Sequence, residues 1–309
     1  MQEAVMVMGF PASGKSRLSQ TYIDKGYTHV NRDKVGGRTI GLVPIFEQAL
    51  KDGLNVVLDN THWKACDRTP FIEAAQRAGV PIRCEWMTTK IEDCSINALH
   101  RMWERHGKLF LHPKDFAEIK GEPNIFPITV LFKFKKEFEK PVKEEGFASL
   151  KKVTFERRPS KHSGKAIIFD YDDTLRTTEG KFKFPTDPSE IRIMPGRKEK
   201  LAALREEGFL LLGVSNQSGV ARKQLTQEQA EACFQATNRM LGVDIEYHYC
   251  PHNVPPCCYC RKPQSALGIL LIEKHKLDPK QCVFVGDQTT DRTFATRLGF
   301  EYVDQADFF

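Results

Sequence analysis

Residues 9–16 read GFPASGKS, directly after the apolar run at residues 5–8 and before a stretch with helical character that starts at Lys15. They match the phosphate-binding pattern GxxxxGK[ST] at every fixed position. Glycines let the backbone turn its N–H groups toward nucleotide phosphates, and the start of a helix adds positive partial charge. We therefore expect Lys15 to reach the β- and γ-phosphates of ATP and Ser16 to ligate Mg²⁺. The predicted ATP-binding residues of this stretch are Gly9, Ser13, Gly14, Lys15 and Ser16.

Outward from this stretch, short apolar runs alternate with amphipathic segments. In the first half the runs lie at residues 29–31, 56–58 and 82–87, and in the second half at 166–169, 209–214, 283–285 and 301–303. Strands separated by helices predict βαβ units and a parallel sheet. A polar segment without apolar periodicity, residues 151–165, lies between the halves. The sequence therefore predicts two α/β domains.

Composition excludes several classes of protein. A chain of 309 residues with 28% charged and 40% hydrophobic residues is typical of a soluble globular protein with room for two domains. No apolar run approaches the ~20 residues that cross a bilayer, and residues 1–9 do not resemble a secretory signal. We therefore expect a cytoplasmic protein, or a nuclear one in a eukaryote, that does not act at a membrane. The formal net charge of +6 lies within residues 1–160, which suits a polyanionic partner.

Polar residues at the ends of the first-half strands predict an acceptor site for phosphoryl transfer. Strand ends converge on the ligand crevice in open α/β sheets. Asp33, at the end of HVNRD, can accept the proton of an attacking hydroxyl, or it can instead cap the following helix. Arg101 and Arg105 lie four residues apart on a predicted helix, where both can close over ATP or form a solvated face. The predicted acceptor-binding residues are Arg38, Asp59, Asn60 and Thr61.

A second phosphate chemistry is predicted where the strand at 166–169 runs into the DxDxT pattern of residues 170–174. Asp170 is the predicted nucleophile toward phosphorus, and Asp172 is the predicted acid that protonates the leaving oxygen and then activates water. Their charges repel a phosphate dianion, so we expect bound Mg²⁺. The predicted Mg²⁺ ligands are Asp170, Asp172 and Asp287, with Asp291 in support. The predicted substrate-contacting residues are Ser215, Asn216, Arg261 and Lys262.

Four of the nine cysteines crowd into residues 250–260, which favours metal binding over disulfides. A CxH pair and a CxC pair can supply a closed tetrahedral Zn²⁺ site, with Cys257 left over. A full thiolate and imidazole shell has no position for substrate, so the zinc is predicted to be structural and to hold the loop that presents Lys262. Free buried thiols are the alternative. The predicted ligands are Cys250, His252, Cys258 and Cys260.

Several phrases in residues 4–150 together resemble the kinase domain of the polynucleotide kinase/phosphatase family, namely GFPASGKS, HVNRD, LDNT, AAQRAGVPIRC and EEGF. The resemblance implies that Lys15 and Ser16 bind ATP and metal, that Asp33 is the general base, and that an arginine-bearing lid covers the site. The strand-end motifs of the second half resemble those of haloacid-dehalogenase-type phosphatases. The cysteine loop resembles that of the histidinol-phosphate and heptose-bisphosphate phosphatases, which act on small metabolites.

These observations predict a P-loop kinase domain with a parallel sheet at residues 1–158 and a haloacid-dehalogenase-like Rossmannoid phosphatase with a zinc loop at 164–309. The predicted function is healing of nucleic-acid ends in strand-break repair, by an ATP-dependent 5'-hydroxyl kinase and a Mg²⁺-dependent 3'-phosphatase. The partners would be DNA or RNA ends and a ligase that acts downstream. A kinase/phosphatase of a small phosphorylated metabolite is the alternative. A non-catalytic end-binding module is disfavoured by intact Lys15, Asp33, Asp170 and Asp172.

Overall fold

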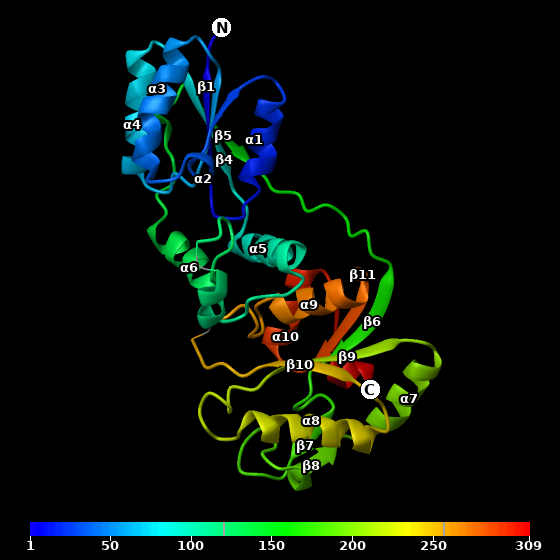
Figure 1. Ribbon diagram of the computed structural model, residues 1–309. Helices are drawn as coiled ribbons and strands as arrows, with labels where there is room; N and C mark the ends of the chain where they lie inside the picture. The colour runs from blue at the N-terminus through cyan, green and yellow to red at the C-terminus, as the bar shows by residue number, and fades with distance from the viewer. Residues whose placement is uncertain (120, 256) are drawn as a thin grey trace. The chain divides into compact units, whose positions relative to one another are not determined.

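The chain divides into two compact units in this computed structural model, which describes residues 1–119, 121–255 and 257–309 (Figure 1). Unit 1 comprises Met1–Ala98 and Ile119–Arg157, and unit 2 comprises Leu99–Glu118 and Arg158–Phe309. Helix α5 (Ile91–His106) therefore contributes residues to both units. The domain boundaries predicted from the sequence stay a prediction. The segment Leu99–Glu118 lies in the first half of the sequence but groups with unit 2.

Unit 1 is built on a five-stranded parallel sheet in the order β2-β3-β1-β4-β5. The strands are β1 (Ala4–Met8), β2 (Thr28–Val30), β3 (Val56–Asp59), β4 (Ile82–Met87) and β5 (Ser149–Val153). Every residue of the central strand β1 is buried. Its alternate side chains enter two different core clusters, Met6 in the larger and Val7 in the smaller, as the period of two in a strand requires. Both faces of the sheet are therefore covered.

Helices provide that cover, with α3 and α4 on one face of the sheet and α1 on the other (Figure 1). The helices are α1 (Lys15–Ile23), α2 (Arg32–Val35), α3 (Val43–Lys51), α4 (Ala65–Arg77), α5 and α6 (Ile128–Glu137), with 3₁₀ turns η1 (Thr39–Leu42), η2 (Pro113–Ile119) and η3 (Lys143–Glu145). Phe46 of α3 packs edge-on against Phe71 of α4, and Tyr22 of α1 enters the smaller cluster. Because the strands are parallel, the loops after β1, β2 and β3 open at the same edge.

Unit 2 contains a second five-stranded parallel sheet, in the order β10-β9-β6-β11-β12. The strands are β6 (Gly164–Phe169), β9 (Leu210–Asn216), β10 (Glu246–Cys250), β11 (Leu277–Gly286) and β12 (Glu301–Asp304). The helices are α7 (Arg197–Glu206), α8 (Gln227–Leu241), α9 (Ala266–His275), α10 (Thr289–Leu298) and α11 (Gln305–Phe308). Phe234 of α8 packs in the core cluster on one face, whereas Phe294 of α10 packs edge-on against Phe284.

A small antiparallel pair forms a cap directly after the DxDxT loop, and it consists of β7 (Arg176–Thr178) and β8 (Ile191–Ile193), with the 3₁₀ turn η4 (Pro188–Glu190) between them. The prediction of two parallel-sheet α/β domains is confirmed. No helix among the described residues combines the length and the apolar character needed to span a bilayer.

Candidate active sites and metal centre

The GFPASGKS loop leaves β1 and enters α1 through backbone conformations that need glycine. A Cβ on Gly9, whose φ is 146°, would lie 2.9 Å from Cβ of Met87 on the neighbouring strand. Gly14 caps α1 with a φ of 96°. The loop is further held from outside, because Thr89 Oγ1 donates to the Ser13 carbonyl at 2.7 Å and Asn97 Nδ2 donates to the Ala12 carbonyl at 2.9 Å. These two side chains hold the loop that leads into the start of α1.

Lys15 bends back over this loop, where its Nζ donates to the carbonyls of Phe10 at 2.8 Å and Gly9 at 3.2 Å. A lysine held in this way lies beside the loop, where phosphate oxygens could replace the loop carbonyls as its hydrogen-bond acceptors. Ser16 is the second residue of α1, so its hydroxyl lies at the same helix start. The predicted roles of these residues toward ATP and Mg²⁺ stay predictions.

Asp33 lies at the start of α2, after β2. Asn31 is the N-cap of this helix, and its side chain accepts from the Asp33 backbone N–H at 2.7 Å. The cap is therefore Asn31 rather than Asp33. The Asp33 carboxylate is about one-third exposed, at 32%, and accepts from Asn124 Nδ2 at 3.0 Å. Arg32 Nη2 pairs with the same carboxylate at 3.2 Å, and the role of Asp33 as a base stays a prediction.

The end of β3 gathers buried polar atoms. Asp59 is 2% exposed, and its Oδ2 lies 3.6 Å from Nε2 of His29. Asn60 Oδ1 accepts from the Arg32 backbone N–H at 3.0 Å, which ties the loop after β3 to α2. The Thr61 carbonyl accepts from the Gly9 N–H at 3.4 Å. These contacts bring the predicted acceptor residues Asp59, Asn60 and Thr61 next to the loops that carry Asp33 and Gly9.

Sequence reasoning missed His62, which is 1% exposed. Burial, together with the charges of Lys15 and Arg68, lowers the pKa of His62 to about 3. Neither ring nitrogen has a hydrogen-bond partner among the described residues. A neutral imidazole is thus enclosed beside Lys15, and the sequence carried no signal for it, because a single histidine after LDNT fits no motif.

The three predicted arginines of the kinase half lie on α5 and at the start of η1. Arg101 and Arg105 lie in the part of α5 that groups with unit 2. Arg38 is exposed at the start of η1. Their roles toward ATP and the acceptor therefore remain predictions.

In unit 2, Lys262 brings the phosphatase motifs together. Its side chain is 1% exposed, and its Nζ lies 3.0 Å from Asp170 Oδ1 and 2.8 Å from Asp291 Oδ1. Nζ also donates to the Val214 carbonyl at 2.8 Å, so oxygens from three different elements lie around the ammonium. Asn216 fixes the backbone of this lysine, since the Asn216 amide and the main chain of Lys262 exchange two hydrogen bonds at 2.9 and 3.1 Å.

The second carboxylate of DxDxT is oriented from two sides. Arg176 Nε lies 2.9 Å from Asp172 Oδ1, and Gln217 Nε2 donates to Asp172 Oδ2 at 2.6 Å. The same Gln217 amide donates to Ser215 Oγ at 3.2 Å. Gln217 was not predicted, although it follows directly after Ser215 and Asn216 in SNQ. Arg261 instead faces the cysteine loop, where it donates to the His252 carbonyl at 3.2 Å.

Three carboxylates form a group that can hold a cation, with one oxygen of each within 4.8 Å of the others. Asp170 follows β6, Asp287 follows β11, and Asp291 lies in the first turn of α10. Burial raises the pKa of Asp170 to about 7 and that of Asp287 to about 6. Asp287 Oδ1 has no hydrogen-bond partner among the described residues. An oxygen-rich, desolvated set with an unused oxygen fits Mg²⁺. Asp291 belongs to this group, whereas the Asp172 carboxylate is engaged by Arg176 and Gln217; the prediction that Asp172 binds Mg²⁺ is untested.

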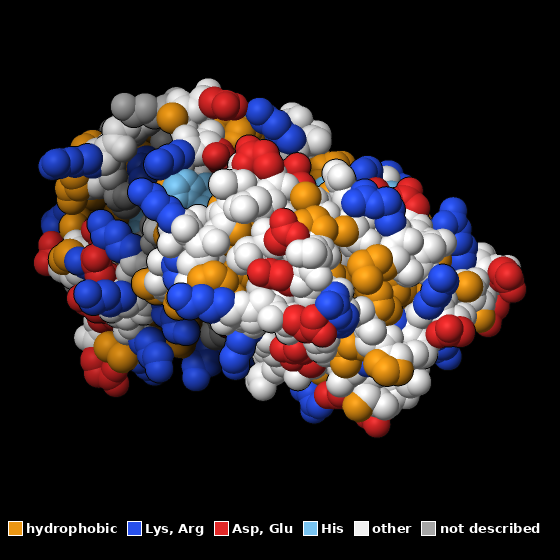
Figure 2. Space-filling view, turned by 90° about the horizontal axis from the view of Figure 1, so that it is seen from below, with side chains coloured by type: hydrophobic (Ala, Val, Ile, Leu, Met, Phe, Trp, Pro, Cys, Tyr) orange, Lys and Arg blue, Asp and Glu red, His pale blue; other side chains and the backbone are white. Residues whose placement is uncertain are grey.

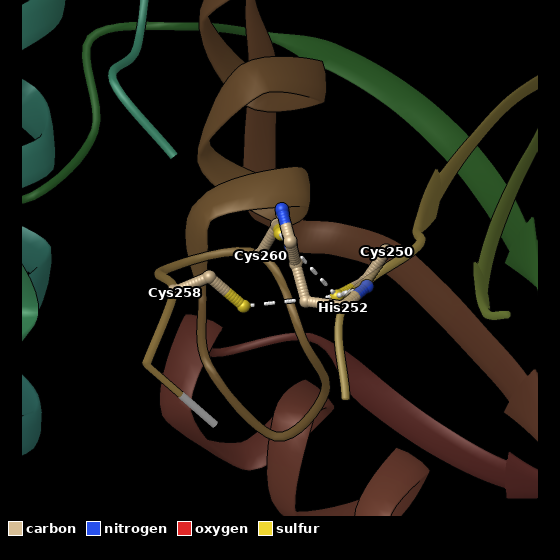
Figure 3. Close-up of side chains that lie close together, drawn as sticks. All are labelled: Cys250, His252, Cys258 and Cys260. Atoms are coloured by element: carbon tan, nitrogen blue, oxygen red, sulfur yellow. Dashed lines mark hydrogen bonds between the residues drawn. The ribbon is translucent and has the colours of Figure 1, made fainter. Parts of the chain in front are cut away.

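The four predicted zinc ligands converge (Figure 3). Cys250 Sγ lies 3.7 Å from Cys258 Sγ and 3.5 Å from His252 Nδ1, and His252 Nδ1 lies 3.2 Å from Cys260 Sγ. Zn–S bonds of about 2.3 Å in a tetrahedron place two sulfurs about 3.8 Å apart. The donor set and its spacing therefore fit Zn²⁺. Cys257 lies outside this group, with its Sγ 3.7 Å from Nε2 of His112.

Together the fold and these sites define an enzyme with a P-loop kinase unit and a haloacid-dehalogenase-like phosphatase unit. Residues 165–309 match the family described as "Polynucleotide kinase 3 phosphatase", and residues 35–108 match the family described as "AAA domain". A relative that is 31% identical and that is covered over 93% of its length shows that the chain belongs to the family of the D-glycero-D-manno-heptose-1,7-bisphosphate 7-phosphatases.

Two curated relatives are similar to parts of this chain. A probable D-glycero-D-manno-heptose-1,7-bisphosphate 7-phosphatase of Thermoplasma volcanium is 31% identical over 139 residues, which are 43% of this chain and 93% of that protein. The bifunctional polynucleotide phosphatase/kinase of Schizosaccharomyces pombe is 31% identical over 174 residues, which are 56% of this chain and 36% of that protein. Among solved structures, a chain of the Pnkp1/Rnl/Hen1 RNA repair complex shares 16% identity and a TM-score of 0.33, covering 98% of this chain and 96% of that one.

Proposed function

We propose that this chain heals nucleic-acid ends, as an ATP-dependent polynucleotide 5'-hydroxyl kinase and a Mg²⁺-dependent polynucleotide 3'-phosphatase. The observation that carries the proposal is the presence, in one chain, of a P-loop unit with an accessible carboxylate at a strand end and a phosphatase unit. A similarity to a bifunctional polynucleotide phosphatase/kinase over 56% of the chain supports the nucleic-acid substrate. Strand-break repair, with a ligase that seals the healed ends, is the proposed setting.

In the kinase unit, the backbone N–H groups of the GFPASGKS loop and Lys15 would bind the ATP phosphates. Bound Mg²⁺, held by Ser16, would offset the charge that develops on the transferring phosphoryl group. Asp33 would accept the proton of the 5'-hydroxyl as its oxygen attacks the γ-phosphorus, and Asn124 would keep the carboxylate turned toward that oxygen. Arg101 and Arg105 would close over the phosphates, and Arg38, Asp59, Asn60 and Thr61 would hold the acceptor strand.

In the phosphatase unit, Asp170 would attack the phosphorus of the 3'-phosphate and form an acyl phosphate, while the leaving 3'-oxygen takes a proton from Asp172. Asp172 would then remove a proton from the water that hydrolyses the acyl phosphate. Gln217 and Arg176 hold the Asp172 carboxylate in one orientation for both steps. Mg²⁺ on the Asp170 group would reduce the repulsion between carboxylates and phosphate dianion. Ser215, Asn216 and Arg261 would contact the substrate, and Lys262 would neutralise charge beside Asp170.

The cysteine loop would bind structural Zn²⁺ through Cys250, His252, Cys258 and Cys260. The loop leads directly into Lys262, so an ordered loop would fix the position of that buried lysine. This loop and the similarity to heptose-bisphosphate phosphatases support a second candidate function, a kinase/phosphatase of a small phosphorylated metabolite.

A matched substrate panel separates the two candidates. DNA and RNA oligonucleotides with 5'-hydroxyl or 3'-phosphate ends would be compared with heptose 1,7-bisphosphate and histidinol phosphate, with ATP and Mg²⁺ present. We expect both oligonucleotide reactions, and we expect Lys15→Ala to lose the kinase by about 100-fold or more while Asp170→Asn loses only the phosphatase. A kcat/KM that is higher for either metabolite than for the 3'-phosphorylated strand would reject the nucleic-acid proposal.

A further inference from the structure

The cap of unit 2 carries an alternation of cations and aromatic rings that the two proposed reactions leave unused. Residues 181–184 read Lys-Phe-Lys-Phe and lie between β7 and β8; we call them the KFKF loop. The rings of Phe182 and Phe184 are stacked, with centroids 5.5 Å apart and planes 7° from parallel. Both rings are partly exposed, and Lys181 and Lys183 are exposed. Parallel rings at a surface offer a face on which a further flat ring can stack.

The KFKF loop is fixed from within the cap. The Glu190 carboxylate accepts from the Thr186 backbone N–H at 2.7 Å, on the far side of the loop. A Cβ on Gly180, just before the loop, would lie 2.5 Å from the same carboxylate, so the chain passes closely over it. Glu179 is paired with Arg192 across the hairpin. A loop that is already ordered loses little entropy when it binds a ligand.

The KFKF loop borders the phosphatase site. A Cβ on Gly219 would lie 2.5 Å from Cζ of Phe184, so this ring lies directly on Gly219. Gly219 comes two residues after Gln217, whose amide holds Asp172.

Cationic side chains lie on two loops that meet where Phe184 contacts Gly219. Arg222 and Lys223 are exposed on the loop that begins at Gly219, and they add to Lys181 and Lys183. Within the same hairpin Glu179 pairs with Arg192, Asp187 caps η4, and Glu190 accepts from the Thr186 backbone. Figure 2 views the molecule from the side of the cap and α8, and on this face Lys and Arg side chains are interspersed with Asp and Glu. A chain of phosphodiesters is the natural complement of stacked rings flanked by cations.

We propose that the KFKF loop binds the terminal bases of a single-stranded polynucleotide whose 3'-phosphate enters the Asp170 site. This inference rests on the proposed function and names the residues that select the substrate. Phe182, backed by the ring of Phe184, would stack on a base, and Lys181 and Lys183 would neutralise the adjacent phosphodiesters. A heptose or histidinol phosphate has neither a second phosphodiester nor a nucleobase, so this loop would favour a strand over either metabolite.

The test compares kcat/KM for a 3'-phosphorylated octanucleotide with that for glycerol phosphate, and the readout is the ratio of the two. Phe182→Leu keeps apolar volume but loses the ring face, and we expect the ratio to fall about 5- to 150-fold. Phe182→Tyr keeps the face and should retain the ratio. Lys183→Ala should make the salt dependence of log kcat/KM for the octanucleotide shallower by about 0.7 per decade of salt. Matched controls are Phe132→Leu, an exposed phenylalanine of α6, and Lys280→Ala, an exposed lysine outside the cap.

The outcomes separate this inference from the proposed function. If the wild type shows no preference for the octanucleotide, the proposed function itself fails. If the wild type prefers the octanucleotide and Phe182→Leu keeps the ratio within about twofold of the wild type, the KFKF loop is not the binding site and the proposed function stands. Equal losses in Phe182→Leu and Phe182→Tyr would also overturn the inference, because they would indicate cap packing rather than stacking.

Discussion

Replacing Lys262 with methionine removes the ammonium that lies between Asp170 and Asp291. Methionine has a similar length, so packing changes little, but both carboxylates then lose a cation partner in a buried site. Breaking a buried ion pair by removing one partner costs about 3 to 5 kcal/mol. The side chain of Lys262 is 1% exposed, so solvent screening does not reduce this value much. The Val214 carbonyl also loses a donor.

For a unit of this size, the cost corresponds to a decrease in Tm of about 6 to 20 °C. Differential scanning calorimetry of the whole chain without divalent cations measures it, and the unit 1 transition should not move. Lys262→Arg keeps the charge and should lose less, and Lys280→Met tests the removal of an exposed lysine. Mg²⁺ should raise the Tm of Lys262→Met more than that of the wild type, because a ligand stabilises the state that binds it. A decrease in Tm below about 2 °C for Lys262→Met would refute the assignment of this lysine as the buried partner of both carboxylates.

Three further predictions test other parts of the chain. Arg68→Met should lower the free energy of unfolding of unit 1 by about 3 to 5 kcal/mol, because the guanidinium is fully buried and pairs with Glu145 at 2.6 Å. Chemical denaturation measures this change. An unchanged denaturation midpoint would contradict the role of this ion pair. Metal analysis of the wild type should find roughly one zinc ion per chain. Cys258→Ser should lose this zinc, whereas Cys66→Ser, at an exposed cysteine, should keep it. Equal zinc content in the two variants would contradict the proposed zinc site. Burial tends to raise the pKa of Glu246, but hydrogen bonds from Lys274 and His248 and the charge of His275 outweigh it and lower the pKa to about 2. The stability that Glu246 contributes is therefore present above its ordinary pKa of 4.5 and is lost as pH falls toward 2. Over that range the Tm of Glu246→Gln should change less with pH than the Tm of the wild type. Parallel plots of Tm against pH for the two proteins would contradict this prediction.

Much of both sites could be predicted from the sequence, because their key residues are local. GFPASGKS and DxDxT each lie within one strand-to-loop turn, where the order of residues determines which atoms face the same point. The zinc ligands come from two short pairs, and their convergence requires only that one loop fold back. The alternation of apolar runs and helical stretches likewise predicted two parallel sheets, since period and spacing are properties of the chain itself.

The sequence alone therefore determined the two folds and the local phosphate and metal motifs. The tertiary structure decided the rest: Lys262 reaches Asp170 and Asp291 from a different loop, Gln217 holds Asp172, and His62 is enclosed and neutral beside Lys15. It also decided that Leu99–Glu118 groups with unit 2. The physical reason is that burial and ion pairing depend on which strands become neighbours in a sheet and on how side chains pack. Neither the order of strands in a sheet nor the packing of side chains can be read from residues that are adjacent in sequence.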